Sequence, residues 1–235
     1  MYRKGFTLAE VLITLAVVGV VAAMTLPSVI NKFRAKALET GFKKSYSNIN
    51  KAFLNAKLEL ESDSIYRDYA VYNYGYNQFS KFSEVFYKKL NAIEKFKGTY
   101  GLKTYSGESS ICGPAGMCTV PKTILADGSS IETAVNGGKI WFVVDTNGPY
   151  KKPNRRGHDV FTFIINDNSD KIQMLKMEKL YTEDELKNVP YPSFEGYPCS
   201  DKSKQEANGI GCAWYAFNNV NPDDSTKTYW DNLPR

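Results

Sequence analysis

The chain has 235 residues and a formal net charge of +5 at pH 7. This length suits one sizeable domain plus an anchor, and the mean hydropathy of −0.39 predicts a water-soluble protein outside one apolar stretch. So mild a charge does not favour nucleic-acid binding, because nucleic-acid-binding domains usually carry a strongly basic face or stripe.

One apolar stretch near the N-terminus organises the rest of the chain. It follows a short basic leader, Met1-Tyr2-Arg3-Lys4, and runs from Phe6 to Ile30. No residue from Val11 to Leu26 is charged, and the run is long enough to cross the hydrocarbon core of a bilayer as a helix. Glu10 is an ionisable residue near the start of this segment, and such residues are functional candidates by default. The alternative is that Glu10 is a helix-end carboxylate that reaches the membrane interface.

The sequence around Gly5 resembles the N-terminal signal of type IV pilins and of type II secretion pseudopilins. The matching residues are Gly5 and Phe6-Thr7-Leu8-Ala9-Glu10, behind the basic leader. The resemblance implies that a prepilin peptidase cuts after Gly5 and methylates the amine of Phe6, so that Glu10 becomes the fifth residue of the mature chain. It also puts Gly19 and Pro27 where the family often has helix-weakening residues.

The resemblance further implies a structural subunit of a helical filament, and not an enzyme. The apolar helix would be stored in the cytoplasmic membrane as a single pass, with the C-terminal bulk outside the cytoplasm. The implied partners are other pilin or pseudopilin subunits, prepilin peptidase, an assembly ATPase and a polytopic assembly platform protein. In this family Glu10 is thought to meet the charged N-terminus of a neighbouring subunit. A type IV pilus and a type II secretion pseudopilus both fit, and so does a minor pilin acting as a membrane-anchored adhesin or DNA-capture module.

An ordinary secretory signal is the competing interpretation of the same residues. The basic start, the apolar core and the small residues Val21-Ala22-Ala23 fit such a signal, and cleavage after Ala23 would release a soluble protein. Against it, Glu10 would lie at the edge of the apolar core, and the helical pattern continues past Ala23. Basic residues flank both ends of the apolar run, so the positive-inside comparison is ambiguous.

The segment after Pro27 predicts an amphipathic helix that continues the apolar one. Its apolar residues recur at steps of four and three: Leu38, Phe42, Tyr46, Ile49, Phe53, Ala56 and Leu60. Gly41 leaves an alternative in which one helix ends there and another begins after it. We therefore divide the chain into a leader (1–5), a transmembrane or filament-core helix (6–30), an amphipathic helix (31–61) and a globular head (62–235).

The head shows a change from helical to strand periodicity. A tyrosine-rich irregular connection at 62–78 precedes a helix that we expect to end by Gly98, with one apolar face made of Phe79, Phe82, Phe86, Leu90 and Ile93. Short strand-like runs follow at 123–126, 129–134, 140–144, 160–165 and 172–177. The first two flank Asp127-Gly128, a strong hairpin signal. Five such strands predict an antiparallel sheet with one face on the long helix, and hence an α+β, pilin-like fold.

The last part of the chain contains one further local signal. Thr182 and Glu185 have the spacing of a capping box, which predicts a brief helix. From Asn188 onward the chain is rich in Pro, Gly and Asn and reads as irregular, with Trp214 and Trp230 as expected packing anchors.

The four cysteines form two pairs that are close in sequence, Cys112 with Cys118 and Cys199 with Cys212. In an exported domain an even number predicts two disulfides, most simply within these pairs, although three connectivities are possible. Zinc is disfavoured, because neither spacing is C-x-x-C and the only histidine, His158, is distant in sequence from both pairs. Disulfides also indicate an oxidising compartment for the head.

Motifs of catalysis are missing from the sequence, which has no nucleophile elbow, H-E-x-x-H or Walker loop. One loop is a candidate metal site, since Asp145, Asn147 and Asp159 place oxygen side chains around a glycine turn and calcium is bound by several oxygens. The alternative, which we favour, is a structured connection whose Asn and Asp side chains bond their own backbone. We expect no cofactor, with calcium at this loop as the one open exception.

Overall fold

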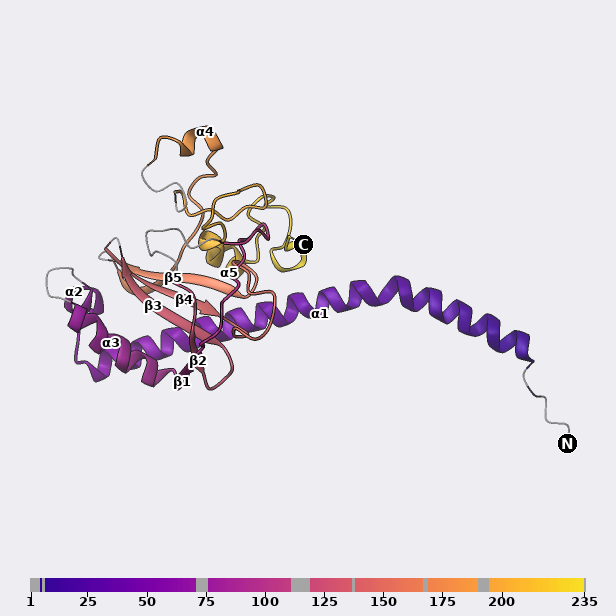
Figure 1. Cartoon of the computed structure of the whole chain (residues 1–235), viewed down its shortest axis with the longest axis horizontal. Helices are drawn as coiled ribbons and strands as arrows, with labels where there is room; N and C mark the ends of the chain where they lie inside the picture. Colours follow the sequence, from indigo (N-terminus) through magenta and orange to yellow (C-terminus); the bar gives the residue numbers. More distant parts are fainter. Residues whose placement is uncertain are drawn as a thin grey trace. The chain divides into compact units, whose positions relative to one another are not determined.

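The computed structural model describes residues 5, 7–70, 76–110, 119–136, 138–166, 169–189 and 195–234. The chain forms two compact units, Met1–Ala37 and Leu38–Arg235, and helix α1 (Leu8–Glu59) contributes residues to both (Figure 1). The remaining elements belong to the second unit: α2 (Ile65–Tyr69), α3 (Tyr76–Lys89), β1 (Ala92–Lys95), β2 (Thr123–Leu125), β3 (Ser130–Asn136), β4 (Lys139–Asp145), β5 (Val160–Asn166), β6 (Ser169–Met174), α4 (Glu183–Leu186), η2 (Ile210–Cys212), α5 (Ala213–Asn218) and η3 (Trp230–Asn232). The predicted α+β class is confirmed.

Helix α1 is one helix of 52 residues, so the alternative with a break near Gly41 is wrong. Pro27 lies inside it. Its N-terminal part contains a window that is long and apolar enough to cross a membrane, with a mean hydropathy of 2.3. The apolar run and the amphipathic run are therefore consecutive parts of a single element, as their patterns predict.

The sheet is an antiparallel meander in the order β1-β2-β3-β4-β5-β6, so every strand pairs with its neighbours in the chain. The central pair β4 and β5 is in register from Ile140 opposite Ile165 to Asp145 opposite Val160. The antiparallel sheet is confirmed, but the structure has a sixth strand. Strand β1 forms because Asn91 adopts a left-handed φ of 53° after α3, and the chain then pairs with β2 instead of continuing the helix.

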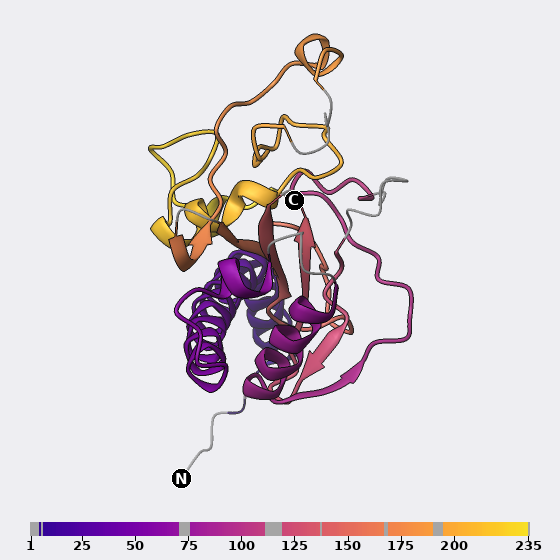
Figure 2. The same ribbon diagram turned by 90° about the vertical axis from the view of Figure 1, so that its left-hand side faces the viewer.

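Helices α1 and α3 lie side by side on one face of the sheet (Figure 2). The ring centroid of Phe42 in α1 is 4.5 Å from that of Phe161, and the ring of Phe86 in α3 is 5.3 Å from Phe142. Phe142 is directly opposite Phe163 in the register, so these rings line the same face. All five side chains are at most 1% exposed. Burial of these large apolar rings is the main force that holds the helices on the sheet.

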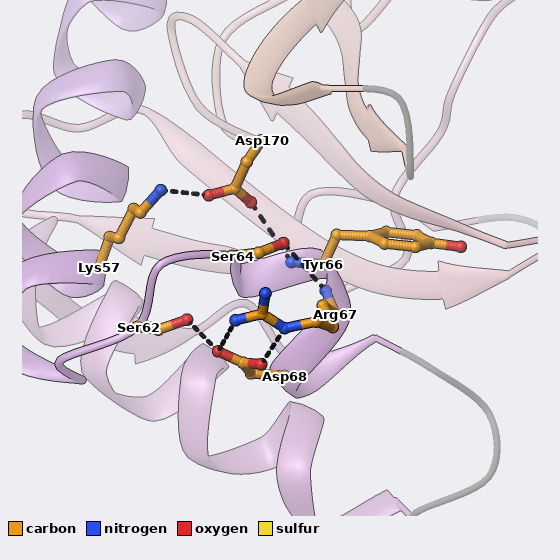
Figure 3. Close-up of polar contacts among 7 residues, drawn as sticks. All are labelled: Lys57, Ser62, Ser64, Tyr66, Arg67, Asp68 and Asp170. Carbon is orange, nitrogen blue, oxygen red and sulfur yellow. Dashed lines mark hydrogen bonds and ion pairs between the residues drawn. The ribbon is translucent and has the colours of Figure 1, made fainter.

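A polar junction fixes the end of α1 to the rest of the head (Figure 3). Lys57 Nζ donates to Asp170 Oδ2 at 2.5 Å, and Asp170 Oδ1 accepts from the N–H of Tyr66 at 3.4 Å. Ser64 caps α2 by accepting a hydrogen bond from the N–H of Arg67 at 3.2 Å. The segment predicted as irregular therefore contains a short capped helix whose first turn shares Asp170 with α1.

Part of the C-terminal segment covers the other face of the sheet. Ile164 of β5 packs with Leu175 and Ile210, and Trp141 and Tyr197 pack against this cluster. The expectation of an irregular C-terminus was incomplete, because η2, α5 and η3 all lie within it.

Of the two tryptophans expected to anchor the C-terminal segment, one is buried and the other is half-buried. Trp230 is an anchor as expected, being 4% exposed and donating from its ring N–H to the carbonyl of Ala216 at 3.0 Å. Trp214 is only half-buried, with Lys176 Nζ 4.0 Å above its ring. The capping box of Thr182 opens α4 as predicted.

Candidate functional site

The first turn of α1 holds Glu10 in a reciprocal capping box with Thr7. Glu10 Oε2 accepts from both the N–H and the hydroxyl of Thr7 at 2.8 Å, and Thr7 Oγ1 accepts from the N–H of Glu10 at 3.2 Å. Such a box satisfies N–H groups that have no partner within the helix, and a carboxylate is also favoured there by the helix dipole. The charged side chain at the edge of the apolar stretch thus has a partner within its own chain.

Thr7 is not among the predicted site residues, although its sequence carried the signal. A threonine followed three residues later by a glutamate is the signature of a capping box, the same pattern that predicts the start of α4. The box makes Thr7 the residue that orients the Glu10 carboxylate in a single subunit.

The remaining N-terminal site residues are only partly described. Gly5 is exposed, and no atom of the other described residues lies within 4 Å of the position that a Cβ would take. Phe6 lies outside the described residues, so cleavage and methylation at this bond stay predictions. Gly19 and Pro27 both lie within α1, and their helix-weakening role also stays a prediction.

The structure contains a disulfide between Cys199 and Cys212, the simplest pairing for these two residues. Both cysteines are 0% exposed. Asn208 cross-links the enclosed loop, accepting from the N–H of Ser200 at 3.1 Å and donating to the carbonyl of Ser203 at 2.9 Å. The other expected disulfide, Cys112 with Cys118, lies outside the described residues.

The connection between β4 and β5 brings together the three residues considered for calcium. At its start, Asp145 is 0% exposed and its Oδ1 accepts from the N–H groups of Asn147 at 3.1 Å and Gly148 at 2.9 Å. Its Oδ2 accepts from the hydroxyl of Tyr100 at 2.7 Å. Burial raises the pKa of Asp145 to about 6, against the opposing effect of these hydrogen bonds.

Asp159 closes the same connection from its other end and is also 0% exposed. Its Oδ1 accepts from the N–H of Arg155 at 2.6 Å, and its Oδ2 accepts from the N–H of Asn154 at 2.9 Å and from the Asn147 side-chain amide at 3.2 Å. Burial, reinforced by the charge of Asp145, raises the pKa of Asp159 to about 7. Asn147 therefore bridges the two carboxyl groups.

These contacts favour the self-bonded connection over a calcium site. All four oxygens of Asp145 and Asp159 already accept hydrogen bonds from the loop backbone, from Asn147 or from Tyr100. Calcium needs six to eight oxygen ligands at about 2.3–2.6 Å, and several donors would have to turn away to make room. In the part of the chain that the structure describes, no group of three or more His, Cys, Asp or Glu is placed to hold a metal ion.

Comparison with known families identifies one motif, at the N-terminal end of the chain. Residues 1–26 match the family model described as the prokaryotic N-terminal methylation motif, which is the signature of type IV pilins and pseudopilins. No curated protein and no solved structure matches the chain. The matched segment contains Gly5, Thr7 and Glu10, and it supports a pilin-like or pseudopilin subunit with a structural role.

Proposed function

We propose that this protein is the precursor of a filament subunit of a type IV pilus or a type II secretion pseudopilus. It is stored in the cytoplasmic membrane, cut after Gly5, methylated on Phe6 and then assembled with other subunits. The observation that carries the proposal is the methylation motif at residues 1–26 directly joined to a helix long and apolar enough to span a membrane. The Cys199–Cys212 disulfide supports a head outside the cytoplasm, because disulfides persist in oxidising compartments.

The part of α1 in the first unit has an exposed apolar surface that must be covered both before and after assembly. From Leu8 to Ile30 every residue except Ala22 is exposed, including Leu12 at 58%, Val18 at 64% and Met24 at 76%. An apolar surface of this extent marks a membrane or protein interaction site. Lipid covers it during storage, and the apolar helices of neighbouring subunits cover it in the filament.

Glu10 gives the assembled filament an axial register. A carboxylate at mid-bilayer costs about 2.5–3.5 kcal/mol on insertion scales, and less near the interface, where the hydrogen bonds from Thr7 help to offset the cost. In the filament, the cationic amine of Phe6 in a neighbouring subunit replaces Thr7 as the partner of the carboxylate. A charge pair among apolar helices is poorly screened, and a single unpaired charge there is costly, so only the matching register is stable.

The processing step is tested by N-terminal mass analysis of the exported protein. We expect a mature chain that begins at methylated Phe6, and a Gly5→Val variant that stays uncut in the membrane. A chain that begins at Met24 would instead establish ordinary secretion and exclude the filament proposal.

Two substitutions of Glu10 distinguish the contribution of its charge to assembly from that of its capping-box hydrogen bonds. Glu10→Gln keeps an acceptor for the hydrogen bonds of Thr7 but has no charge, whereas Glu10→Ala loses both. We expect both variants to be cleaved and membrane-bound yet scarce in sheared filaments, while the control Thr14→Val, one turn further along α1, assembles normally. If Glu10→Gln gave a normal filament yield and Glu10→Ala did not, the role of Glu10 in assembly would belong to the capping box and not to the ion pair.

The second candidate is a minor subunit whose head binds a ligand. The observation that favours it is a cavity of about 550 Å³ in the head, lined by residues 180–183, 186 and 202–206. Quantification of sheared filaments distinguishes the two, because a filament-body subunit is abundant in that fraction and a minor binding subunit is scarce.

A further inference from the structure

Charged residues bound the apolar stretch of α1 at both ends. After Glu10 the next charged residue is Lys32, and one uninterrupted helix contains both. The residues between them, Val11 to Asn31, span about 32 Å at 1.5 Å per residue. This matches the roughly 30 Å thickness of a bilayer's hydrocarbon core. A membrane-embedded α1 therefore has Glu10 at one boundary and Lys32 at the other.

The residues that follow this stretch form a cationic collar, which we define as Lys32, Phe33, Arg34 and Lys36. At 3.6 residues per turn, Lys32 and Lys36 lie about 40° apart around the helix, and Arg34 lies on the opposite side. Lys32, Arg34 and Lys36 are exposed, and Phe33 is 73% exposed. The collar therefore carries three formal positive charges and an apolar ring within little more than one turn of the helix.

We propose that the collar binds anionic phospholipid headgroups at the outer surface of the cytoplasmic membrane and so fixes the depth of the helix before assembly. The inference rests on the proposed function, because it requires α1 to span that membrane. Each Lys or Arg near an anionic membrane surface strengthens binding about fivefold, so three contribute roughly a hundredfold. Phe33 adds an apolar side chain that can enter the boundary between headgroups and acyl chains.

Cleavage makes the collar the dominant charge beside the span. Arg3 and Lys4 leave with the leader, and the mature N-terminal end keeps the amine of Phe6 and the carboxylate of Glu10, whose charges cancel. The remaining net charge next to the apolar stretch is then that of the collar. The positive-inside tendency does not account for basic residues on the outer side, whereas attraction to anionic headgroups does.

The test uses the full chain in mixed micelles with equal phosphatidylglycerol and phosphatidylcholine, and counts retained lipids by native mass spectrometry. We expect the wild type to prefer phosphatidylglycerol and the triple variant Lys32→Gln, Arg34→Gln, Lys36→Gln to lose at least tenfold of that preference. The control removes three charges from exposed positions of the second unit: Lys51→Gln, Lys81→Gln and Lys151→Gln. It should keep the wild-type preference.

Equal phosphatidylglycerol retention by the wild type and the collar variant would overturn the inference, and so would an equal loss in the control. Cell fractionation and N-terminal analysis of the wild type separate this failure from failure of the proposed function. A chain that begins at Met24 or is absent from membranes contradicts both. A membrane-integrated chain that begins at Phe6 but shows no lipid preference contradicts the collar alone. A collar variant that binds lipid normally but does not enter filaments would reassign these cations to a contact between subunits.

Discussion

Replacing Phe42 by alanine should destabilise the second unit strongly, because this ring joins α1 to two other parts of the head. Phe42 is 0% exposed, and its ring centroid is 4.5 Å from Phe161, 6.1 Å from Phe163 and 5.8 Å from Trp230. Truncating a buried phenylalanine costs about 3–5 kcal/mol, and these aromatic contacts put Phe42 near the upper end. For a unit of this size each kcal/mol lowers the Tm by about 2–4 °C, so we expect a drop of about 10–20 °C.

The assay is thermal and urea unfolding of the full chain in detergent, followed by tryptophan fluorescence. The chain's tryptophans, Trp141, Trp214 and Trp230, all lie in the second unit, so the signal reports on the head. The matched control is Leu54→Ala on the same helix, where the side chain is 58% exposed and the loss should stay within about 0.5 kcal/mol. If Phe42→Ala cost no more than this control, the packing of α1 on the sheet through this ring would be refuted.

Three further predictions concern the head. Reducing the Cys199–Cys212 disulfide should cost about 2–3 kcal/mol. We expect a Tm drop on adding reductant that persists in a Cys112→Ser, Cys118→Ser variant and disappears when Cys199 and Cys212 are also replaced by serine. Burial lowers the pKa of His158 from 6.5 to about 3, so below pH 6.5 the unfolded chain takes up a proton that the folded chain does not. The contribution of His158 to the free energy of unfolding should therefore fall by about 1.4 kcal/mol per pH unit as the pH drops from 6.5 towards 3. A His158→Gln variant should show a flatter dependence of stability on pH in this range. Gly148→Ala should cost more than 3 kcal/mol of stability, because Gly148 has a φ of 84° and a Cβ there would lie 2.0 Å from the carbonyl oxygen of Gly128. Gly128→Ala should cost only about 1 kcal/mol, because Gly128 has a φ of 85° but a Cβ there would enter open space. Equal losses of stability in the two variants would contradict the close approach of Gly148 to Gly128.

Sequence periodicity predicted the elements whose cause is local. The apolar stripe of α1 and the strands β3 to β5 are visible as patterns within one segment. Strand β1 was missed because Ile93 continues the helical spacing of α3, so a local pattern assigns it to the helix. What ends the helix is the left-handed Asn91, and what makes the strand is pairing with β2, about 30 residues later.

The candidate sites also divide into those set by a local sequence pattern and those set by contacts between distant segments. Glu10 could be found because its motif is contiguous, and Thr7 could have been found from the same few residues. The contact of Tyr100 with Asp145 joins residues 45 apart in the sequence, and that of Lys57 with Asp170 joins residues 113 apart. No pattern within either segment indicates its partner, since only the folded sheet brings them together.

The meander order of the sheet has a consequence for how the head folds as the chain is delivered. Each strand from β3 to β6 pairs with the strand that precedes it across a connection of at most 14 residues, so each of these pairings closes a short loop and carries a small entropic cost. The sheet can therefore form from residues 123–174 before the C-terminal segment arrives. Trp230, which packs on Phe42, comes more than 50 residues later. The aromatic cluster between α1 and the sheet is thus completed last, when η3 docks onto a sheet that is already formed.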